Sequence, residues 1–290
     1  MNYIRLTKPR SVALLLVTAL AGMVMARPGY PPLTLLALTL LGGALAAGGA
    51  NTLNCYLDRD MDRLMPRTQG RPLPSGRIPP ARALAFGLLL CLLSVTVFAV
   101  GVNPLSALLA AAGVFYYVIV YTLWLKRATP LNIVIGGGAG VMPLLVGSAA
   151  ATGRISSWAL WFGAIILLWT PPHFWSLALV RNKEYLQAAV PMLPAVRGEE
   201  ETRRRILACA TLLFLLTLLL APAGFASPLF LAVALLLAGW LLFRAMLLLH
   251  RGTPEAARQL YRYSILYLAV LFGSLILDRL SGGTSLPGLS

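Results

Sequence analysis

The chain has 290 residues, of which 59% are hydrophobic and 11% are charged, and its mean hydropathy is +0.80. Soluble domains carry about 25% charged residues, so this composition excludes an ordinary soluble globular protein. The apolar residues form long unbroken runs and do not alternate with polar ones, which excludes a transmembrane β-barrel. The sequence therefore predicts an all-α integral membrane protein that lies in a lipid bilayer.

Nine apolar runs follow one another along the chain, and each is close to the length of about 20 residues that crosses a bilayer as a helix. They cover residues 11–26, 33–57, 83–102, 105–125, 130–151, 156–180, 205–224, 228–249 and 263–280. We therefore expect nine transmembrane helices. An alternative for the first run is a cleaved secretory signal, because Ala19-Leu20-Ala21 resembles a cleavage site.

The net charge of +15 is concentrated at the ends of these runs. With a cytoplasmic N-terminus, 21 of the 24 Lys and Arg residues fall inside, and only Arg27, Arg154 and Arg279 fall outside. The positive-inside rule predicts this distribution, so the charge requires no nucleic acid partner. It also predicts an outer C-terminus and puts both long polar loops, about 58–82 and 181–204, on the cytoplasmic side.

Three of the nine acidic residues lie between Asp58 and Asp62. If the second run continues as a helix, Asn54, Asp58 and Asp62 recur every four residues and form one polar stripe. Like charges at this spacing repel one another, so the stripe needs a cation. Mg²⁺ fits, because one or two carboxylates, phosphate oxygens and water usually hold it. The alternative is a solvated helix end that Arg59 and Arg63 neutralise.

Arginines interleaved with Gly and Pro follow directly after the stripe. Arg67 and Arg71 lie in this stretch, and guanidinium groups match phosphate oxygens in shape and charge. The positive-inside rule alone also places arginines here. Beside carboxylates that bind a divalent metal, however, they predict a diphosphate site at the membrane surface.

An aromatic segment, Trp169-Thr-Pro-Pro-His173-Phe174, leads into the second cytoplasmic loop. Glu184 lies eleven residues after His173, about three helical turns away, and is a candidate ligand for a second metal ion. Arg181 or Lys183 is a candidate phosphate contact. An isolated histidine is more often a hydrogen-bonded packing residue than a ligand or base, so both interpretations of His173 stay open.

The pattern Asn54-x-x-x-Asp58-x-x-x-Asp62 resembles the first aspartate motif of the UbiA superfamily of intramembrane prenyltransferases. Longer strings are similar to the protoheme IX farnesyltransferases of that superfamily: Thr7-Lys8-Pro9-Arg10, residues 54–76, residues 169–174, Tyr185 and Pro191-Met192-Leu193-Pro194. The resemblance runs nearly end to end. It implies a single domain over residues 1–290, whose nine helices surround a central cavity that opens to the cytoplasmic side.

The resemblance also implies a reaction and its participants. Farnesyl diphosphate is the expected donor, haem B (protoheme IX) the acceptor, Mg²⁺ the cofactor, and haem O the product. Haem A synthase or terminal oxidase assembly factors are the further partners. The implied catalytic residues are Asn54, Asp58, Asp62, His173 and Tyr185; the implied substrate contacts are Tyr56, Arg67, Arg71, Trp169, Phe174, Arg181 and Lys183; and the implied metal ligands are Asp58, Asp62 and Glu184.

One departure from the family pattern concerns the second loop. Two adjacent aspartates are expected before the tyrosine, but this chain has Lys183-Glu184. Glu184 retains a carboxylate at this position. Lys183 does not carry over as a metal ligand, and its expected role is a direct contact with the diphosphate.

In the expected mechanism, metal held by Asp58 and Asp62 stabilises the departing diphosphate. Aromatic faces stabilise the allylic cation. A haem vinyl group then attacks the farnesyl carbon, and water quenches the resulting cation to a hydroxyl. His173 contacts the haem iron, contacts a propionate or steers that water, and the sequence leaves these roles open.

Two alternatives remain at this point. Another UbiA-type enzyme would prenylate an aromatic or quinone precursor. A multispan secondary transporter would instead hold its acidic groups near the bilayer midplane, often at broken helices. No mitochondrial presequence precedes the Thr7–Arg10 segment, so we expect a prokaryotic plasma (inner) membrane.

Overall fold

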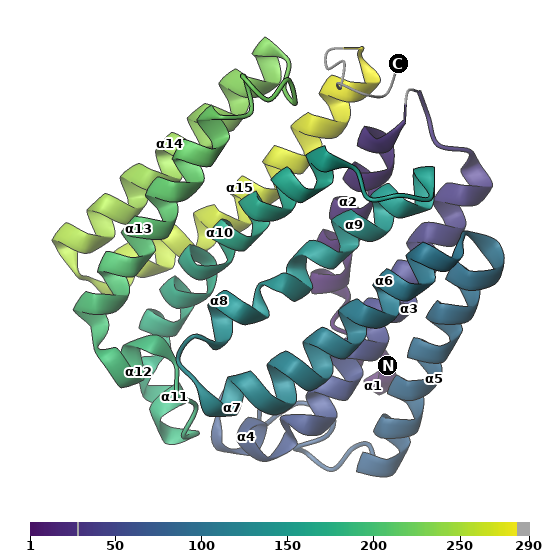
Figure 1. Cartoon of the computed structure of the whole chain (residues 1–290). Helices are drawn as coiled ribbons and strands as arrows, with labels where there is room; N and C mark the ends of the chain where they lie inside the picture. Colours follow the sequence, from purple (N-terminus) through teal and green to yellow (C-terminus); the bar gives the residue numbers. More distant parts are fainter. Residues whose placement is uncertain (28, 283–290) are drawn as a thin grey trace.

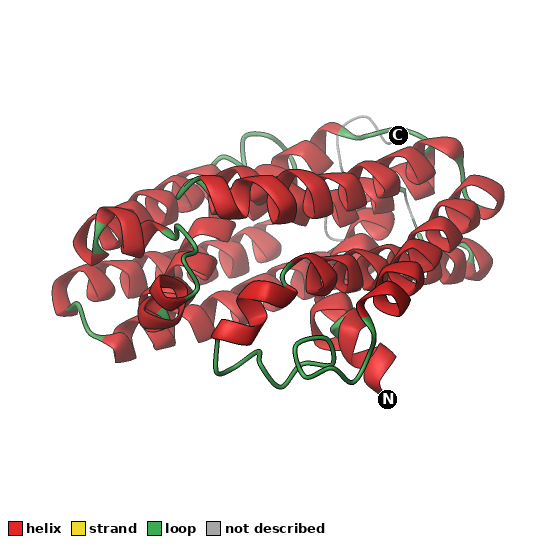
Figure 2. Ribbon diagram, turned by 90° about the horizontal axis from the view of Figure 1, so that it is seen from below, coloured by secondary structure: helices red, strands yellow, loops and turns green. Residues whose placement is uncertain are grey.

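A computed structural model of the chain describes residues 1–27 and 29–282. Within these residues the regular structure is helical throughout, as Figure 2 shows from below the view of Figure 1. The elements are α1 (Asn2–Thr7), α2 (Pro9–Ala26), α3 (Leu33–Leu57), α4 (Arg59–Leu64), α5 (Pro80–Gly101), α6 (Pro104–Phe115), the π-helix η1 (Tyr116–Leu125), α7 (Lys126–Ala128), α8 (Asn132–Gly136), α9 (Gly138–Thr152), α10 (Ser157–Val180), α11 (Asn182–Gln187), α12 (Leu193–Arg197), α13 (Glu199–Leu218), α14 (Pro228–Arg251) and α15 (Pro254–Leu280).

Among the described residues, eight stretches are long and apolar enough to cross a membrane. The chain is therefore a multi-pass membrane protein, as its composition predicts. The stretches are 9–26, 33–57, 80–101, 104–128, 132–152, 157–180, 228–251 and 254–280. They match eight of the nine predicted runs, seven to within a few residues, whereas the last span begins nine residues before its predicted run of 263–280.

The remaining predicted run, 205–224, overlaps α13. This helix has 20 residues, but its first turn is Glu199-Glu200-Glu201 and three arginines follow Thr202. The apolar part that is left is too short to qualify as a span by length and composition. The prediction of nine transmembrane helices is therefore not confirmed and stays a prediction. Figure 1 shows α13 packed alongside α14.

Proline and capping residues determine where several long helices begin. Proline occupies the first positions of α2, α5, α6, α14 and α15, where its missing N–H costs nothing and its fixed φ suits a helix. The Asn103 side chain accepts a hydrogen bond from the Ser106 N–H at 2.8 Å and caps α6, and Thr253 caps α15 in the same way. Proline and capping residues therefore mark the first turn of these helices.

The two predicted functional loops lie at the same end of the bundle. Figure 1 shows at its lower end the short helices α1, α4, α7, α11 and α12. The last long helix, α15, ends at the opposite end. This arrangement brings the segments after α3 and after α10 to one side of the molecule, which a shared site requires.

The helices α2 and α9 approach each other closely because two glycines face the contact. A Cβ atom at Gly22 would lie 2.4 Å from the Leu144 carbonyl oxygen, and one at Gly147 would lie 2.0 Å from the Ala19 carbonyl oxygen. Small residues at such crossings let helix backbones pack directly in a membrane protein. The α2–α9 contact therefore tolerates no side chain at either position.

We predict that Gly147→Val destabilises the fold by at least ~2 kcal/mol, because the added side chain overpacks a backbone contact. Thermal unfolding in detergent measures the effect. Gly273→Ala is the matched control, because nothing lies within 4 Å of a Cβ atom built at Gly273. Equal melting temperatures for Gly147→Val and the unmodified chain would contradict the close approach of α2 and α9.

Candidate functional site

The predicted polar stripe lies at the end of α3 and is buried. Asn54, Asp58 and Asp62 are only 4%, 2% and 5% exposed. The helix is not continuous through the stripe, because α3 ends at Leu57 and α4 begins at Arg59. The spacing nevertheless survives, since the Asp58 N–H donates to the Asn54 carbonyl at 2.9 Å and the Asp62 N–H donates to the Asp58 carbonyl at 2.8 Å. Three polar side chains therefore share one buried face.

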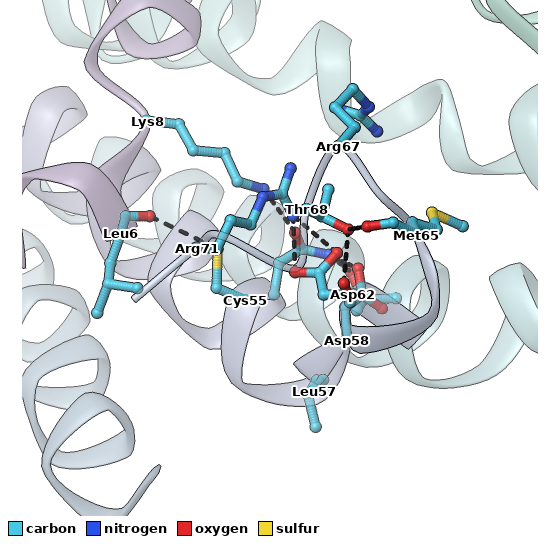
Figure 3. A network of polar contacts seen from close by, with 12 residues as sticks. Leu6, Lys8, Cys55, Leu57, Asp58, Asp62, Met65, Arg67, Thr68 and Arg71 are labelled. Carbon is cyan, nitrogen blue, oxygen red and sulfur yellow. Dashed lines mark hydrogen bonds and ion pairs between the residues drawn. The ribbon is translucent and has the colours of Figure 1, made fainter. Parts of the chain in front are cut away.

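Each member of the stripe is paired with a cation from a different segment. The cations come from the junction of α1 and α2, from the start of α7 directly after η1, and from the loop after α4. Figure 3 shows Lys8 and Arg71 beside Asp58 and Asp62. The contacts join Lys8 Nζ to Asn54 Oδ1 at 2.7 Å, Lys126 Nζ to Asp58 Oδ2 at 2.5 Å, and Arg71 Nη1 to Asp62 Oδ1 and Oδ2 at 2.9 and 2.7 Å. Three positive charges therefore surround two carboxylates.

The Asn54 amide is held in one orientation. Its Nδ2 donates to Asp58 Oδ2 at 2.8 Å and to Thr122 Oγ1 at 3.1 Å. The Thr122 hydroxyl in turn donates to the Tyr117 carbonyl at 2.8 Å, within the π-helix η1. Such helices are rare and often occur at functional sites. This network turns Asn54 Oδ1 toward Lys8.

Glu184 brings the second loop to the stripe. Arg67, in the loop after α4, has its Nε 4.0 Å from Glu184 Oε2, and Arg181 donates from Nη1 to Glu184 Oε1 at 2.5 Å. Met61 and Met65 also belong to the same hydrophobic cluster as residues 188, 190 and 192. The two loops, far apart in sequence, therefore meet at one end of the bundle.

Two carboxylate oxygens in this region have no hydrogen-bond partner among the described residues. Asp58 Oδ1 and Glu184 Oε2 are buried and accept no hydrogen bond within the described chain. Carboxylate oxygens are the preferred protein ligands of Mg²⁺, which one or two of them usually hold together with phosphate oxygens. In the described residues, however, no group of three or more acidic, His or Cys side chains is close enough to hold an ion. The residues fit a metal ion whose remaining ligands come from the substrate.

The structure does not bring two of the predicted substrate contacts to the stripe. Tyr56 packs against the small cluster around Leu6 and Leu73, and the Arg59 guanidinium lies 4.4 Å from its ring centroid. Two residues after Asn54, it points to the opposite side of α3, because successive helical residues turn by about 100°. Tyr56 therefore lies apart from the stripe, and its role as a substrate contact stays a prediction. Lys183 is exposed, and no ion pair holds it within the described residues.

His173 lies in an aromatic cluster on α10 and α15. Its ring stacks on Trp169 at 4.5 Å and on Tyr261 at 4.9 Å, and meets Phe174 edge-on at 4.9 Å between centroids. Ser264 Oγ lies 2.8 Å from His173 Nδ1. Three of the predicted residues therefore lie together within a membrane-spanning helix.

Hydrogen bonding assigns the tautomer of His173. The Ser264 hydroxyl donates its proton to the Tyr261 carbonyl at 2.7 Å. It therefore accepts from His173, whose Nδ1 carries the proton, and Nε2 is left with a lone pair. A neutral imidazole in this state accepts a proton or a metal ion through Nε2 and does not donate from it.

Burial and charge also shift the pKa values of residues at the end of the bundle that carries the stripe. Burial lowers the pKa of Lys8 and raises that of Tyr185, which is half-buried beside Glu184 in sequence. Two hydrogen bonds from Arg127, at 2.8 Å each, lower the pKa of Asp60 to about 2. Asp60 faces away from the stripe, so Arg127 neutralises the one acidic residue of this segment that the site does not use.

Sequence reasoning missed Lys8, Thr122 and Lys126 as site residues. Lys126 counted only toward the positive-inside distribution, and Lys8 appeared only there and in the family-like string Thr7–Arg10, without a role. Their partners lie 46 and 68 residues away in sequence, so no local spacing identifies the pairs. The available signal was a lysine at the end of a neighbouring span.

The comparisons with known proteins identify the family of this chain. Residues 15–272 match the UbiA prenyltransferase family, and the chain belongs to that family of intramembrane prenyltransferases. Its fold resembles that of a UbiA homologue from Archaeoglobus fulgidus bound to GPP and Mg²⁺, with a TM-score of 0.74 at 18% identity over 97% of this chain and 100% of that one.

Within the family, the chain is similar to proteins named protoheme IX farnesyltransferase. It is 47% identical to the one from Symbiobacterium thermophilum over 96% of this chain and 93% of the relative. It is 48% identical to the one from Roseiflexus castenholzii over 96% of this chain. The chain spans only 52% of the length of that second relative.

We predict that Asp60→Asn removes a small acid-sensitive part of the stability. Because the folded-state pKa is depressed, the stabilisation is present above the ordinary value of 3.8 and is lost as the pH falls toward about 2. The Asp60 side chain is 60% exposed, so the contribution is below ~1 kcal/mol. Unfolding in detergent across this pH range measures it, and identical profiles for both proteins would contradict the assignment.

Proposed function

We propose that this chain transfers a farnesyl group from farnesyl diphosphate to a vinyl group of haem B, with addition of water, and so forms haem O and diphosphate. The observation that carries the proposal is the buried stripe of Asn54, Asp58 and Asp62 with three cations around it. A polyanion bound with a divalent metal uses both the carboxylates and the cations of such a site. The named relatives support the choice of donor and acceptor.

The residues at the stripe bind and orient the diphosphate. Asp58 and Asp62 would hold Mg²⁺, and Glu184 would offer a ligand to a second metal ion; the metal supplies charge stabilisation to the departing diphosphate when bound. Lys126 and Arg71 lie beside the carboxylates, where their donors meet phosphate oxygens. Arg67 and Arg181 extend this positive charge toward the second loop. Lys183 is exposed and would contact the diphosphate as it enters from solution.

The farnesyl group needs an apolar, aromatic environment. Its chain has no polar atoms, so it gains by leaving water. When the C–O bond to the diphosphate breaks, the allylic carbon becomes positive, and nearby aromatic faces stabilise it by roughly 1–2 kcal/mol each when desolvated. Trp169, Phe174 and Tyr185 are the candidates for this role. They also exclude water until the vinyl group has reacted.

His173 is proposed to act on the haem side of the reaction. Its Nε2 is an acceptor, since the proton is on Nδ1. This state supports contact with the haem iron or acceptance of a proton from the water that forms the hydroxyl. It does not support donation of a hydrogen bond to a propionate.

We also propose the single-domain organisation over residues 1–290, a prokaryotic plasma (inner) membrane, a cytoplasmic N-terminus and an outer C-terminus. The cavity would open to the cytoplasmic side. The distribution of 21 of 24 basic residues supports this orientation. A transporter fits the molecule less well, because the acidic groups lie at the end of the bundle.

The test is a product mass spectrum from purified protein supplied with haem B, farnesyl diphosphate and Mg²⁺. We expect the mass of haem O, and we expect none when Mg²⁺ is chelated. Asp58→Ala should reduce turnover by at least ~10²-fold, because it removes a carboxylate ligand of the metal. Gly273→Ala is the control for handling and insertion. Full activity of Asp58→Ala in protein that inserts normally would remove the proposed metal site.

We predict that His173→Ala weakens haem binding by about tenfold or more, as loss of a ligand contact does, while the affinity for farnesyl diphosphate stays within about twofold. Haem titration followed by absorbance and a separate farnesyl diphosphate titration measure the two effects. Because His173 also packs between Trp169 and Tyr261, the His173→Phe variant, which keeps an aromatic ring but has no nitrogen, controls for lost packing. Unchanged haem affinity in both variants would rule out contact with the iron.

A further inference from the structure

The short helix α1 and Lys8 form an N-terminal strap, residues 2–8, that lies against the cytoplasmic end of α3. Asn51 Nδ2 donates to the Thr7 carbonyl at 3.0 Å, and Cys55 Sγ lies 3.9 Å from the Leu6 carbonyl. Leu6 is 1% exposed and packs in a cluster with Cys55. The strap is therefore fixed to the same helix that carries the stripe.

Lys8 has an unfavourable backbone conformation. Its φ of 53° and ψ of 64° are left-handed, which is uncommon for residues other than glycine. The following residue is proline, which further disfavours a compact conformation at the residue before it. Non-glycine residues in such conformations persist only where their surroundings hold them, and they concentrate at functional sites. The observation calls for a role for the Lys8 side chain.

The conformation directs the Lys8 side chain into the stripe. Figure 3 shows it extending from the strap toward Arg71 and the carboxylates. Its ammonium contacts Asn54 Oδ1 at 2.7 Å, which is a neutral acceptor. Within residues 1–27 and 29–282, no carboxylate lies within 4.0 Å of this ammonium, whereas Lys126 and Arg71 each have one.

Lys8 is therefore the unneutralised cation of the site. A partly buried charge without a counter-ion is unfavourable, and it becomes favourable when an anion binds beside it. Two of the three ammonium donors have no described protein partner. Arg71 also lies nearby (Figure 3), and two adjacent cations attract a polyanion more strongly than either one alone.

We propose that Lys8 is a diphosphate-binding residue that the N-terminal strap delivers to the stripe. This inference rests on the proposed function and adds a contact to it. Asn54 holds the ammonium in place through Oδ1, and an allylic diphosphate supplies the negative charge that the site lacks. The left-handed backbone is then the conformational cost of bringing this side chain to the substrate.

The experiment measures binding of farnesyl diphosphate with Mg²⁺ to the full chain in detergent by calorimetry. Lys8→Gln should raise the Kd by about tenfold, because a charge-assisted hydrogen bond is lost. Lys8→Gly should give the same loss, although glycine accepts the left-handed backbone without strain. Lys8→Arg should restore most of the affinity. Arg5→Gln is the matched control, since it removes an exposed charge from the same strap.

Farnesol and inorganic diphosphate separate the possible outcomes. Farnesol has no phosphate, so its affinity should be the same for all variants, and a parallel fall would overturn the inference in favour of a structural role. A Kd of Lys8→Gln within twofold of the unmodified chain would also overturn it. If the unmodified chain binds inorganic diphosphate but not farnesyl diphosphate, the proposed function fails, and the diphosphate titration of the same variants still decides the role of Lys8.

Discussion

The burial of two carboxylates and an amide at the end of α3 requires cations and hydrogen-bond partners from the segments around them. Charges taken out of water are costly unless they are paired and hydrogen-bonded. Asp58 and Asp62, at 2% and 5% exposure, meet this condition through their ion pairs with Lys126 and Arg71, and Asp58 also accepts a hydrogen bond from Asn54. Because the two cations come from the start of α7 and from the loop after α4, the stripe can be buried only when this end of the bundle is assembled.

The same pairing prepares the site for a polyanion. Glu184 repeats the arrangement in the second loop, where Arg181 and Arg67 face its two oxygens. Asp58 and Glu184 are each paired with a cation and yet retain one oxygen without a hydrogen bond, whereas both oxygens of Asp62 accept from Arg71. The proposed metal ligands and phosphate donors therefore lie side by side before any substrate binds. Such preorganisation reduces the cost of ordering the site on binding.

Sequence patterns predicted the parts of this protein that depend on local periodicity. Apolar runs located seven spans to within a few residues, and four-residue spacing placed Asp58 and Asp62 on one face. Contacts between distant segments could not be predicted in this way, which is why Lys126 and Thr122 were missed. Tyr56 was named by residue type, and helical rotation places it apart from Asn54. The charged first turns of α13 show that composition alone does not decide a span.

The depth of the aromatic cluster relative to the stripe suits the order of events in prenyl transfer. His173 precedes the end of α10 at Val180 by seven residues, which is about 10 Å along a helix. In the proposed reaction, a diphosphate held at Asp58 would stay at the polar end, where its charge is matched. A haem bound through His173 would lie deeper, among Trp169 and Tyr261. The allylic carbon would connect these two environments, so that the cation would form where aromatic faces replace water and the leaving group would remain where cations hold it.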